Sequence, residues 1–406
     1  MNTVSSIKLS KLLLCVAAAL LLPACSNNNN NFNDNRIESL TVTSYNMGLA
    51  LNFVPYTEER LVANEQLMAD YDSDVICLQE VWLEEYVEGI EQALKPNYPY
   101  IYTVEPEQVF SESAACTNEE IADFAECGNT QCTGLTGSDL VACAPAQCGA
   151  SLAELSPGCF DGVVATVGIP DITVEAMIEA VTQPTGLFTY DGALGLMLAS
   201  KYELRAREFQ DFIDDSSSSH RGALYAEIEV NRATQVVACT HPTANLANIP
   251  YPGSGKHGSW GGENRFMQEQ MIAFANNKAG DNPIFFAGDF NCSIANESTG
   301  VAGDLAANCQ LWRDDGFVDP AAEQLPCTYC SDENLLLEEE EGSKELLDHI
   351  FVKNVDGNNA IVAERVFDDP VSIEALVPPS ELQPEDSPML THPSDHFGVE
   401  LEITLP

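Results

Sequence analysis

The chain has 406 residues, 45% of them hydrophobic, which suits one large domain, or one domain with insertions, around a sizeable core. Its formal net charge is −46, because 63 acidic residues stand against only 17 basic ones. Proteins that bind nucleic acid through counterion release usually have a basic face, so this charge argues against a stable nucleic-acid partner. This negative charge suits an exported protein whose charged surface keeps it soluble.

The N-terminus has the features of an export signal. Two lysines precede an apolar run over residues 12–22, which is too short to span a bilayer as a permanent helix. The run ends in LPAC at Cys25, which resembles a bacterial lipobox and predicts a lipoprotein signal peptide over residues 1–24. The Asn-rich residues 25–36 are expected to form a tether, and Ser26 favours the outer membrane. We expect an outer-membrane lipoprotein, with secretion to the periplasm or the exterior as the alternative.

The rest of the chain alternates strand-like and helix-like patterns, which predicts an α/β fold. Strands are expected at residues 37–46, 75–78, 196–199, 223–230, 235–240, 284–287, 349–352 and 397–403, and helices at 58–71 and 265–276. Polar residues follow the ends of several of these strands, where a layered sheet protein gathers its functional loops.

Between residues 103 and 190 this pattern lapses, and six cysteines recur with ten and four intervening residues in alternation. Their segments look like three copies of a short unit, each with two or three helical turns, and the four-residue gaps would be chain reversals. We predict a helical insertion stapled by three disulfides, with fifteen connectivities possible. The insertion is either a lid or a contact surface for substrate or membrane, or a peripheral addition without a functional role, whose small hydrophobic core needs disulfides for stability.

The other cysteines divide into two groups. Cys77 and Cys239 lie in apolar strand patterns and are expected to be buried free thiols. Apart from Cys15 in the signal and Cys25, the remainder are expected to form disulfides in an oxidising compartment. The pairs expected outside the insertion are Cys292–Cys309 and Cys327–Cys330. A run of four acidic residues, Glu338 to Glu341, is expected to be a solvated loop.

Polar motifs next to these strands carry the candidate chemistry. They are SYNMG at Asn46, DVICLQEVW at Glu80, ACTHP at His241, FFAGDFNCS at Asp289 and Asn291, LLDHIFV at Asp348, and PSDHFGV at Asp395 and His396. A lone Glu80 after a buried strand would be costly without a function. Hydrolysis of a phosphodiester needs neutralised phosphate charge, an aligned water and a stabilised leaving oxygen, and hard oxygen ligands suit Mg²⁺.

This ordered set resembles the endonuclease/exonuclease/phosphatase superfamily, the deoxyribonuclease-I-like fold. The resemblance covers a domain over residues 37–405, interrupted by the Cys-rich insertion at 103–190. It implies a four-layered α/β sandwich, in which two packed mixed sheets are flanked by helices. It also implies phosphoester cleavage that depends on Mg²⁺ or another divalent cation such as Mn²⁺.

The resemblance further implies a role for each residue. Asn46 and Glu80 would hold the metal, with Asp395 close behind, and Asp289 would orient or deprotonate the attacking water. Asn291 would donate to the phosphate and help place that water, His241 would contact the phosphate as a charged donor, His396 would contact it or act as base, and Asp348 would orient His396.

Five further assignments stay open or minor. Arg221 is either a basic phosphate contact or a structural residue, and His220 is a weaker candidate. His241 could instead cap a loop. His349 is expected to pack rather than catalyse, and His257 to be exposed in a Gly-rich loop.

The fold alone does not choose the phosphoester. The acidity, the export signal, and blocks similar to those of secreted and neutral sphingomyelinases favour a sphingomyelinase-like phospholipase C. Its partners would be a phospholipid head group and, through the lipid anchor, a membrane, and we expect a monomer. The alternatives are an extracellular deoxyribonuclease-I-like nuclease and a non-catalytic surface-binding lipoprotein.

Overall fold

The computed structural model describes residues 36–246, 249–252, 255–337, 342–357, 359–373 and 389–405. The expected signal peptide, the tether apart from Arg36, and the acidic run Glu338 to Glu341 lie outside the described residues. Residues 37–406 form one compact unit by their internal contacts.

Two large sheets make up the centre of this unit. The 6-stranded sheet has the order β12-β15-β1-β2-β4-β3, and the 5-stranded sheet has the order β11-β8-β7-β6-β5. The first contains β1 (Ser39–Leu49), β2 (Val75–Val81), β3 (Tyr100–Tyr102), β4 (Met197–Ser200), β12 (Ile361–Val366) and β15 (Gly398–Thr404). The second contains β5 (Arg205–Asp211), β6 (Gly222–Val230), β7 (Ala233–Thr240), β8 (Ile284–Asp289) and β11 (Asp348–Lys353). Both are mixed, because β1 runs parallel to β2 and β7 runs parallel to β8.

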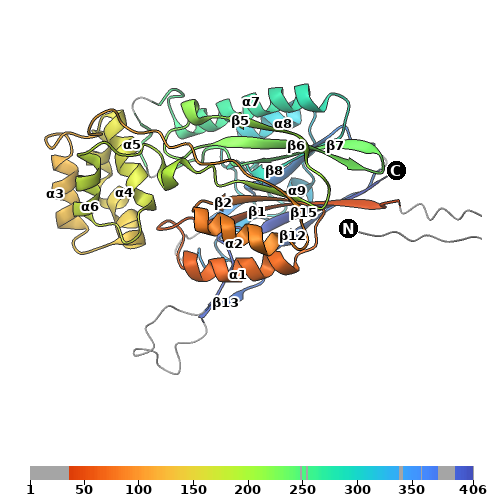
Figure 1. The fold of residues 1–406 in the computed structure, drawn as a ribbon, viewed down its shortest axis with the longest axis horizontal. Helices are drawn as coiled ribbons and strands as arrows, with labels where there is room; N and C mark the ends of the chain where they lie inside the picture. The colour runs from red at the N-terminus through yellow and green to blue at the C-terminus, as the bar shows by residue number, and fades with distance from the viewer. Residues whose placement is uncertain are drawn as a thin grey trace, which may run out of the picture. The chain divides into compact units, whose positions relative to one another are not determined.

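Helices cover the outer faces of both sheets (Figure 1). The 6-stranded sheet carries α1 (Thr57–Asp70) and α2 (Glu84–Leu94), and the 5-stranded sheet carries α7 (Trp260–Ala279) and α8 (Ala306–Asp314). The short α9 (Pro320–Gln324) precedes two small hairpins, β9 (Tyr329–Cys330) with β10 (Lys344–Glu345) and β13 (Val371–Ile373) with β14 (Met389–Thr391). The predicted four-layered sandwich is confirmed.

The strand sequences explain this layering, because successive side chains of a strand point to opposite faces. In β2, Val75 and Cys77 pack between the sheets, whereas Ile76 and Leu78 pack under α1 and α2. In β8, Phe285 likewise faces the other sheet while its neighbours face α7 and α8. Since both faces are covered, these strands consist of continuous apolar residues, and each large buried side chain contributes about 1.5–3 kcal/mol.

A disulfide joins the two sheets through their central strands. Cys77 of β2 bonds to Cys239 of β7, with 5.2 Å between their Cα atoms. The prediction of free thiols was therefore wrong. Each cysteine occupies an inward-facing position, and the pattern of one strand does not reveal which strand of the other sheet lies opposite. The expected pairs Cys292–Cys309 and Cys327–Cys330 are confirmed.

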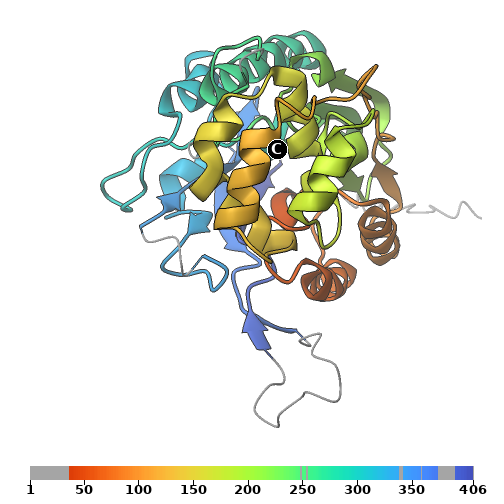
Figure 2. The ribbon, with the colours of Figure 1, turned by 90° about the vertical axis from the view of Figure 1, so that its left-hand side faces the viewer.

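The helical insertion lies between β3 and β4 in the sequence and at one end of the sandwich (Figure 2). It contains α3 (Ala122–Gln131), α4 (Gly137–Ala153), α5 (Pro157–Ala165) and α6 (Val174–Val181), with short 3-10 turns at η1 (Thr166–Gly168) and η2 (Thr189–Gly192). Its three disulfides are nested: Cys116–Cys159 encloses Cys127–Cys148, which encloses Cys132–Cys143. The stapled helical insertion is confirmed.

The arrangement inside the insertion differs from three self-contained units. Only the middle unit, from Cys132 to Cys143, closes on itself. The four-residue gaps lie along α3 and within α4, and the chain reverses between Cys132 and Gly137. The two inner bonds thus hold α3 against α4 as one helical hairpin, and the outer bond joins the segment before α3 to α5. This explains why regular spacing did not mean repeated units.

No helix within the described ranges has both the length and the apolar composition needed to cross a bilayer.

Candidate active site

The strand arrangement brings the polar motifs to one edge. Glu80 lies near the end of β2, Asp289 ends β8, and His241 directly follows β7. Because β7 and β8 are parallel, their ends lie at the same edge, and Asp348 at the start of antiparallel β11 pairs directly with Asp289. His396 enters the same edge just before β15.

Asp289 is the centre of the contacts. Its Oδ2 accepts a hydrogen bond from Asn46 Nδ2 at 3.0 Å and lies 3.4 Å from His241 Nε2 and 3.9 Å from His396 Nε2. The same Asn46 nitrogen donates to Glu80 Oε1 at 3.2 Å. Side chains that are distant in the sequence therefore share one buried polar cluster.

His396 and Asp348 form a second pair in this cluster. His396 Nδ1 lies 2.8 Å from Asp348 Oδ2, so the carboxylate fixes the orientation of the ring and leaves Nε2 facing Asp289. Although burial opposes the charged ring, Asp348 and Asp289 raise the pKa of His396 well above its usual value. The imidazole is therefore a proton donor at neutral pH.

His241 behaves in the opposite way. Burial, the Arg221 charge and the His396 charge lower the pKa of His241 well below its usual value. Its Nδ1 is buried without a hydrogen-bond partner in the described part of the chain. The structure thus favours a neutral ring that donates through Nε2, rather than the charged donor expected from the resemblance.

The two central carboxylates are hard to ionise in this setting. Burial, with a contribution from Asp395, raises the pKa of Glu80 to about 7. Burial also raises the pKa of Asp289 to about 6, against the lowering effect of His396. This accumulated negative charge suits a cation, which would relieve the repulsion among the carboxylates.

The Asp395 carboxylate lies directly against the backbone of Gly48 in β1. A Cβ on Gly48, whose φ is +54°, would lie 2.3 Å from Asp395 Oδ1, so only glycine admits the carboxylate there. Ser394 Oγ donates to the Asn46 carbonyl at 2.7 Å, and the buried Arg60 donates to the carbonyls of Met47 and Pro393 at 3.1 Å each. These bonds join the loop that carries Asp395 to β1.

The donor set fits a hard divalent cation, with one condition. Glu80 and Asp395 offer carboxylate oxygens, but Asn46 faces Glu80 with its nitrogen, while its Oδ1 accepts from the Gly48 N–H at 3.0 Å. Asn46 would therefore ligate a cation only after its amide turned. The clusters Cys292–Cys309–His349 and Cys327–Cys330–Glu333 also have ligand atoms close together, but their cysteines are oxidised and do not bind metal as thiolates.

Asn291 and Arg221 complete the predicted set. Asn291 has a φ of 50°, its N–H donates to Asp289 Oδ1 at 2.9 Å, and its Nδ2 donates to the Pro242 carbonyl at 3.1 Å. Glu80 also has a left-handed backbone, with a φ of 59°. Such strain costs about 1–3 kcal/mol per residue and persists where the surroundings fix it, commonly at functional sites. Arg221 Nη1 donates to the His241 carbonyl at 3.4 Å.

The remaining histidines lie outside this cluster. His349 stacks on Phe351 and forms an ion pair with Asp319 at 3.2 Å, in keeping with the expected packing role. His257 stacks on Phe266 and is only partly exposed, so the prediction of an exposed side chain was wrong. His220 is buried and contacts the carbonyl of Gly192.

Sequence reasoning missed three residues around the site. They are Arg60, which supports the loops, Trp82, whose ring centroid lies 6.1 Å from that of His241, and Tyr190, which stacks on Trp82. Trp82 was visible in DVICLQEVW, but Tyr190 lies in the insertion, where no motif marks it.

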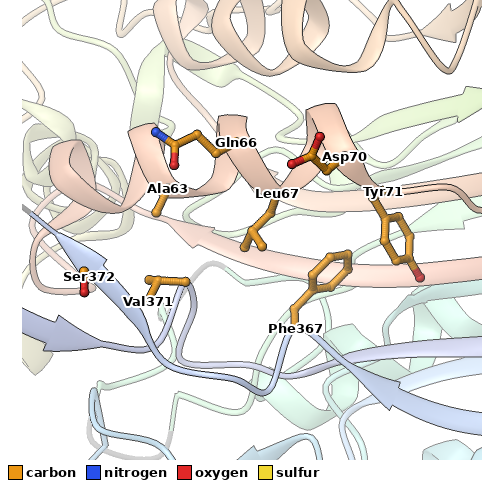
Figure 3. A pocket seen from close by; sticks show the side chains of 8 residues that line it. All are labelled: Ala63, Gln66, Leu67, Asp70, Tyr71, Phe367, Val371 and Ser372. Atoms are coloured by element: carbon orange, nitrogen blue, oxygen red, sulfur yellow. The ribbon is translucent and has the colours of Figure 1, made fainter.

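A separate groove of about 530 Å³ lies on the surface between α1 and the segment 367–372. Figure 3 shows its lining, which includes Leu67 and Tyr71 from the α1 side and Phe367 opposite them. None of the predicted site residues lines this groove.

Solved structures support the fold. Sphingomyelinase C from Streptomyces griseocarneus matches with a TM-score of 0.50 and 16% identity, over 90% of this chain and 99% of that chain. A double mutant of beta toxin from Staphylococcus aureus with bound magnesium ions matches with a TM-score of 0.50 and 13% identity, and SmcL with 0.50 and 15%, each over 90% of this chain and 99% of the other. At these identities the likeness concerns the fold alone.

No curated protein matches the chain. A family model described as the Endonuclease/Exonuclease/phosphatase family matches residues 44–396, from just before Asn46 to His396. Members of this family are generally metal-dependent phosphoesterases. With the match extending over most of its length, the chain belongs to the Endonuclease/Exonuclease/phosphatase family.

Proposed function

We propose that this protein is an exported phosphodiesterase, dependent on Mg²⁺ or a similar divalent cation, that cleaves a phospholipid head group in the manner of a sphingomyelinase. The observation that carries the proposal is the meeting of Asn46, His241 and His396 at one oxygen of Asp289, with Glu80 beside them. This arrangement combines a proton acceptor, proton donors and cation ligands in one place.

The proton positions suggest a division of roles. Asp289, with a pKa of about 6, is ionised at neutral pH and accepts a proton from the attacking water. His396, held protonated by Asp348, donates to the leaving oxygen or stabilises its charge. His241 and Asn291 donate to phosphate oxygens, and Arg221 supplies positive charge.

Glu80 and Asp395, with Asn46 once its amide has turned, would hold the divalent cation. When bound, the cation neutralises charge on the phosphate and stabilises the transition state for in-line attack. Burial, together with the Asp395 charge, raises the pKa of Glu80, and this supports the placement, since a cation would lower the free-energy cost of ionising Glu80.

Three observations support a lipid rather than a nucleic-acid substrate. The net charge of −46 opposes binding to an extended polyanion. The six disulfides within the described part of the chain fit an oxidising compartment, as expected for an exported protein. The blocks that are similar to those of sphingomyelinases, DVICLQEVW, GLMLASKYEL and RGALYAEI, lie along β2, β4 and β6, beside the site.

The experiment is a side-by-side assay of the purified protein with sphingomyelin, phosphatidylcholine, plasmid DNA and an inositol phosphate. Each substrate is tested with Mg²⁺, with Mn²⁺ and with a chelator, and Asp289→Asn controls for contaminating hydrolases. We expect metal-dependent release of phosphocholine from sphingomyelin. Cleavage of plasmid DNA alone would replace this proposal with a nuclease, and no cleavage of any substrate would favour a binding protein.

Export through a lipid anchor is proposed from the sequence alone. Growth with labelled palmitate should label the full-length chain, and Cys25→Ala should remove the label. Secretion without an anchor would leave both forms unlabelled. A sedimentation measurement of the soluble domain tests the expected monomer.

A further inference from the structure

Arg221 is a buried cation whose donors are only partly used. Its side chain is 8% exposed, and burial lowers the pKa of its guanidinium, against the raising effects of Glu80, Asp289 and Glu263. Its one side-chain hydrogen bond to another described residue is the long contact to the His241 carbonyl, and no described carboxylate forms an ion pair with it. A buried charge without a direct partner is costly, so its remaining donors suit an anion that binds there.

Trp82 lies against this guanidinium. Arg221 Cζ is 5.5 Å from the centroid of the indole ring, a cation–π distance. The indole cannot easily shift, because it is 4% exposed and a Cβ on Gly195 would lie 2.6 Å from its Cε3 atom. The ring thus fixes one side of the Arg221 position.

Tyr190 of η2 fixes the indole in turn. The two ring centroids are 5.2 Å apart with an angle of 20° between the planes, and the Tyr190 hydroxyl donates to the Leu51 carbonyl at 2.8 Å. Tyr190 has a left-handed backbone, with a φ of 52°, and Gly168 packs closely against its ring. Strained backbone at a buried stacking residue indicates a position that the surroundings enforce.

The same segment also holds the loop that leads to Arg221. The Thr189 N–H donates to the Ser218 carbonyl at 2.9 Å, and the Thr189 and Ser219 hydroxyls are 3.0 Å apart. His220 Nδ1 lies 2.9 Å from the Gly192 carbonyl. The residues of η2 are therefore linked to Arg221 in two ways, through the stacked indole of Trp82 and through hydrogen bonds to residues 218–220, which directly precede Arg221.

We propose that η2, the segment through which the chain leaves the insertion, positions Arg221 to bind the phosphate group of the substrate, with Tyr190 and Trp82 as positioning residues. The inference rests on the proposed function in giving Arg221 a phosphate to bind. It assigns the insertion a part in the site, in place of a purely decorative role.

The test measures binding of inorganic phosphate to the full-length protein by calorimetry in the presence of Mg²⁺. Tyr190→Leu removes the stack but keeps an apolar side chain, whereas Tyr190→Phe keeps the stack and removes only the hydroxyl. We expect Tyr190→Leu to weaken phosphate binding about tenfold, or about 1.4 kcal/mol, and Tyr190→Phe to change it less than about twofold. Tyr98→Leu is the matched control, because Tyr98 is a fully buried tyrosine in the layer under α1 and α2 and should affect stability alone.

A double-mutant cycle separates positioning from a general loss of structure. Arg221→Gln alone should weaken phosphate binding at least as much as Tyr190→Leu, and adding Tyr190→Leu to it should cause no further loss. The inference would be overturned if Tyr190→Leu weakened phosphate binding equally in wild type and in the Arg221→Gln background. It would also be overturned if Arg221→Gln left phosphate binding unchanged. If Tyr190→Leu does not fold, Trp82→Leu in the same cycle gives the same decision.

Phosphate binding separates this inference from the proposed function. If no phosphoester is hydrolysed but the cycle shows coupling, the positioning role stands and the proposed activity fails. If sphingomyelin is hydrolysed while the two sites act independently, the activity stands and the positioning role fails.

Discussion

The sandwich and the insertion achieve order by different means. In the sandwich, apolar side chains fill the space between two sheets and beneath the helices on either side. In the insertion, one small cluster of sixteen buried residues includes four disulfide cysteines. Small cores rarely stabilise themselves, so the insertion depends on covalent links to a degree that the sandwich does not.

Charge separates the two regions as well. Residues 103–190 contain thirteen acidic residues and no lysine, arginine or histidine, so every basic residue of the chain lies elsewhere. Like charges without counter-charges destabilise a compact state. The insertion therefore carries both the thinner core and the greater repulsion, while the candidate chemistry stays in the sandwich.

The largest expected effect tests where the chemistry lies. Asp289→Asn keeps the size of the side chain but removes the proton acceptor, so turnover should fall about 10³- to 10⁴-fold. Burial raises the pKa of Asp289 because the folded state disfavours the charged carboxylate. Removing this carboxylate should therefore not lower the free energy of unfolding of the metal-free protein. Steady-state kinetics and denaturant unfolding measure both quantities. Retained turnover would remove Asp289 from the mechanism.

The second prediction tests the dependence on disulfides. Replacing Cys116 and Cys159 by alanine opens a link with a sequence separation of 43, for which the chain-entropy model predicts a loss of about 4 kcal/mol. We expect α3–α6 to lose hydrogen-exchange protection at a denaturant concentration where β1 and β8 remain protected. The control is the sandwich pair Cys327–Cys330, with a separation of 3, whose removal should cost about 2 kcal/mol and leave the insertion protected. A single transition for the whole chain would show that the insertion is integral to the sandwich core.

The third prediction concerns protons and metal at Glu80. Since burial and Asp395 raise the pKa of Glu80 to about 7, protons compete with the cation below that pH. The Mg²⁺ concentration for half-maximal activity should rise about tenfold for each pH unit below 7.

The metal-free protein gives the matching stability measurement. Glu80 ionises at about 7 in the folded state and at 4.5 in the unfolded state, so between these values the folded state holds the additional proton. The free energy of unfolding contributed by Glu80 should therefore fall as pH rises from 4.5 to 7. Glu80→Gln should reduce the measured slope, while the part that comes from Asp289 remains below about pH 6, and an unchanged slope would show that Glu80 does not contribute to it.

The same two regions differ in how far the sequence predicted them. The strands of the sandwich were predictable because β2 and β8 are apolar on both faces, and because site residues follow parallel strands whose ends meet at one edge. The Cys77–Cys239 bond was not, since it depends on which strands of two sheets face each other. In the insertion, the spacing of cysteines predicted stapled helices but not the nested pairing. Tyr190 could not be found without the path of the chain in space.

The smallest expected effect is a pH dependence that belongs to the sandwich. Although burial opposes a charge on His349, the ion pair with Asp319 raises its pKa above the usual 6.5, and its Nε2 lies 3.0 Å from the Cys292 carbonyl. A raised folded pKa means that this stability is fully present below pH 6.5 and is lost as pH rises through the folded value.

The insertion has no histidine, but burial raises the pKa of Asp161 in α5 to about 7, so the two regions are compared above that pKa, where Asp161 is ionised in both the folded and the unfolded state. In wild type, the free energy of unfolding of the sandwich should decline above pH 6.5, while hydrogen exchange of α3–α6, corrected for its intrinsic pH dependence, should report constant stability once Asp161 is ionised. His349→Phe would still stack on Phe351 but leave Asp319 with Arg313 as its remaining ion-pair partner among the described residues, at 3.2 Å. Its deficit relative to wild type should be greatest at low pH and shrink as pH rises. A deficit that is constant across pH would mean that the ring acts by packing alone, and that the pair with Asp319 does not set the stability of the sandwich.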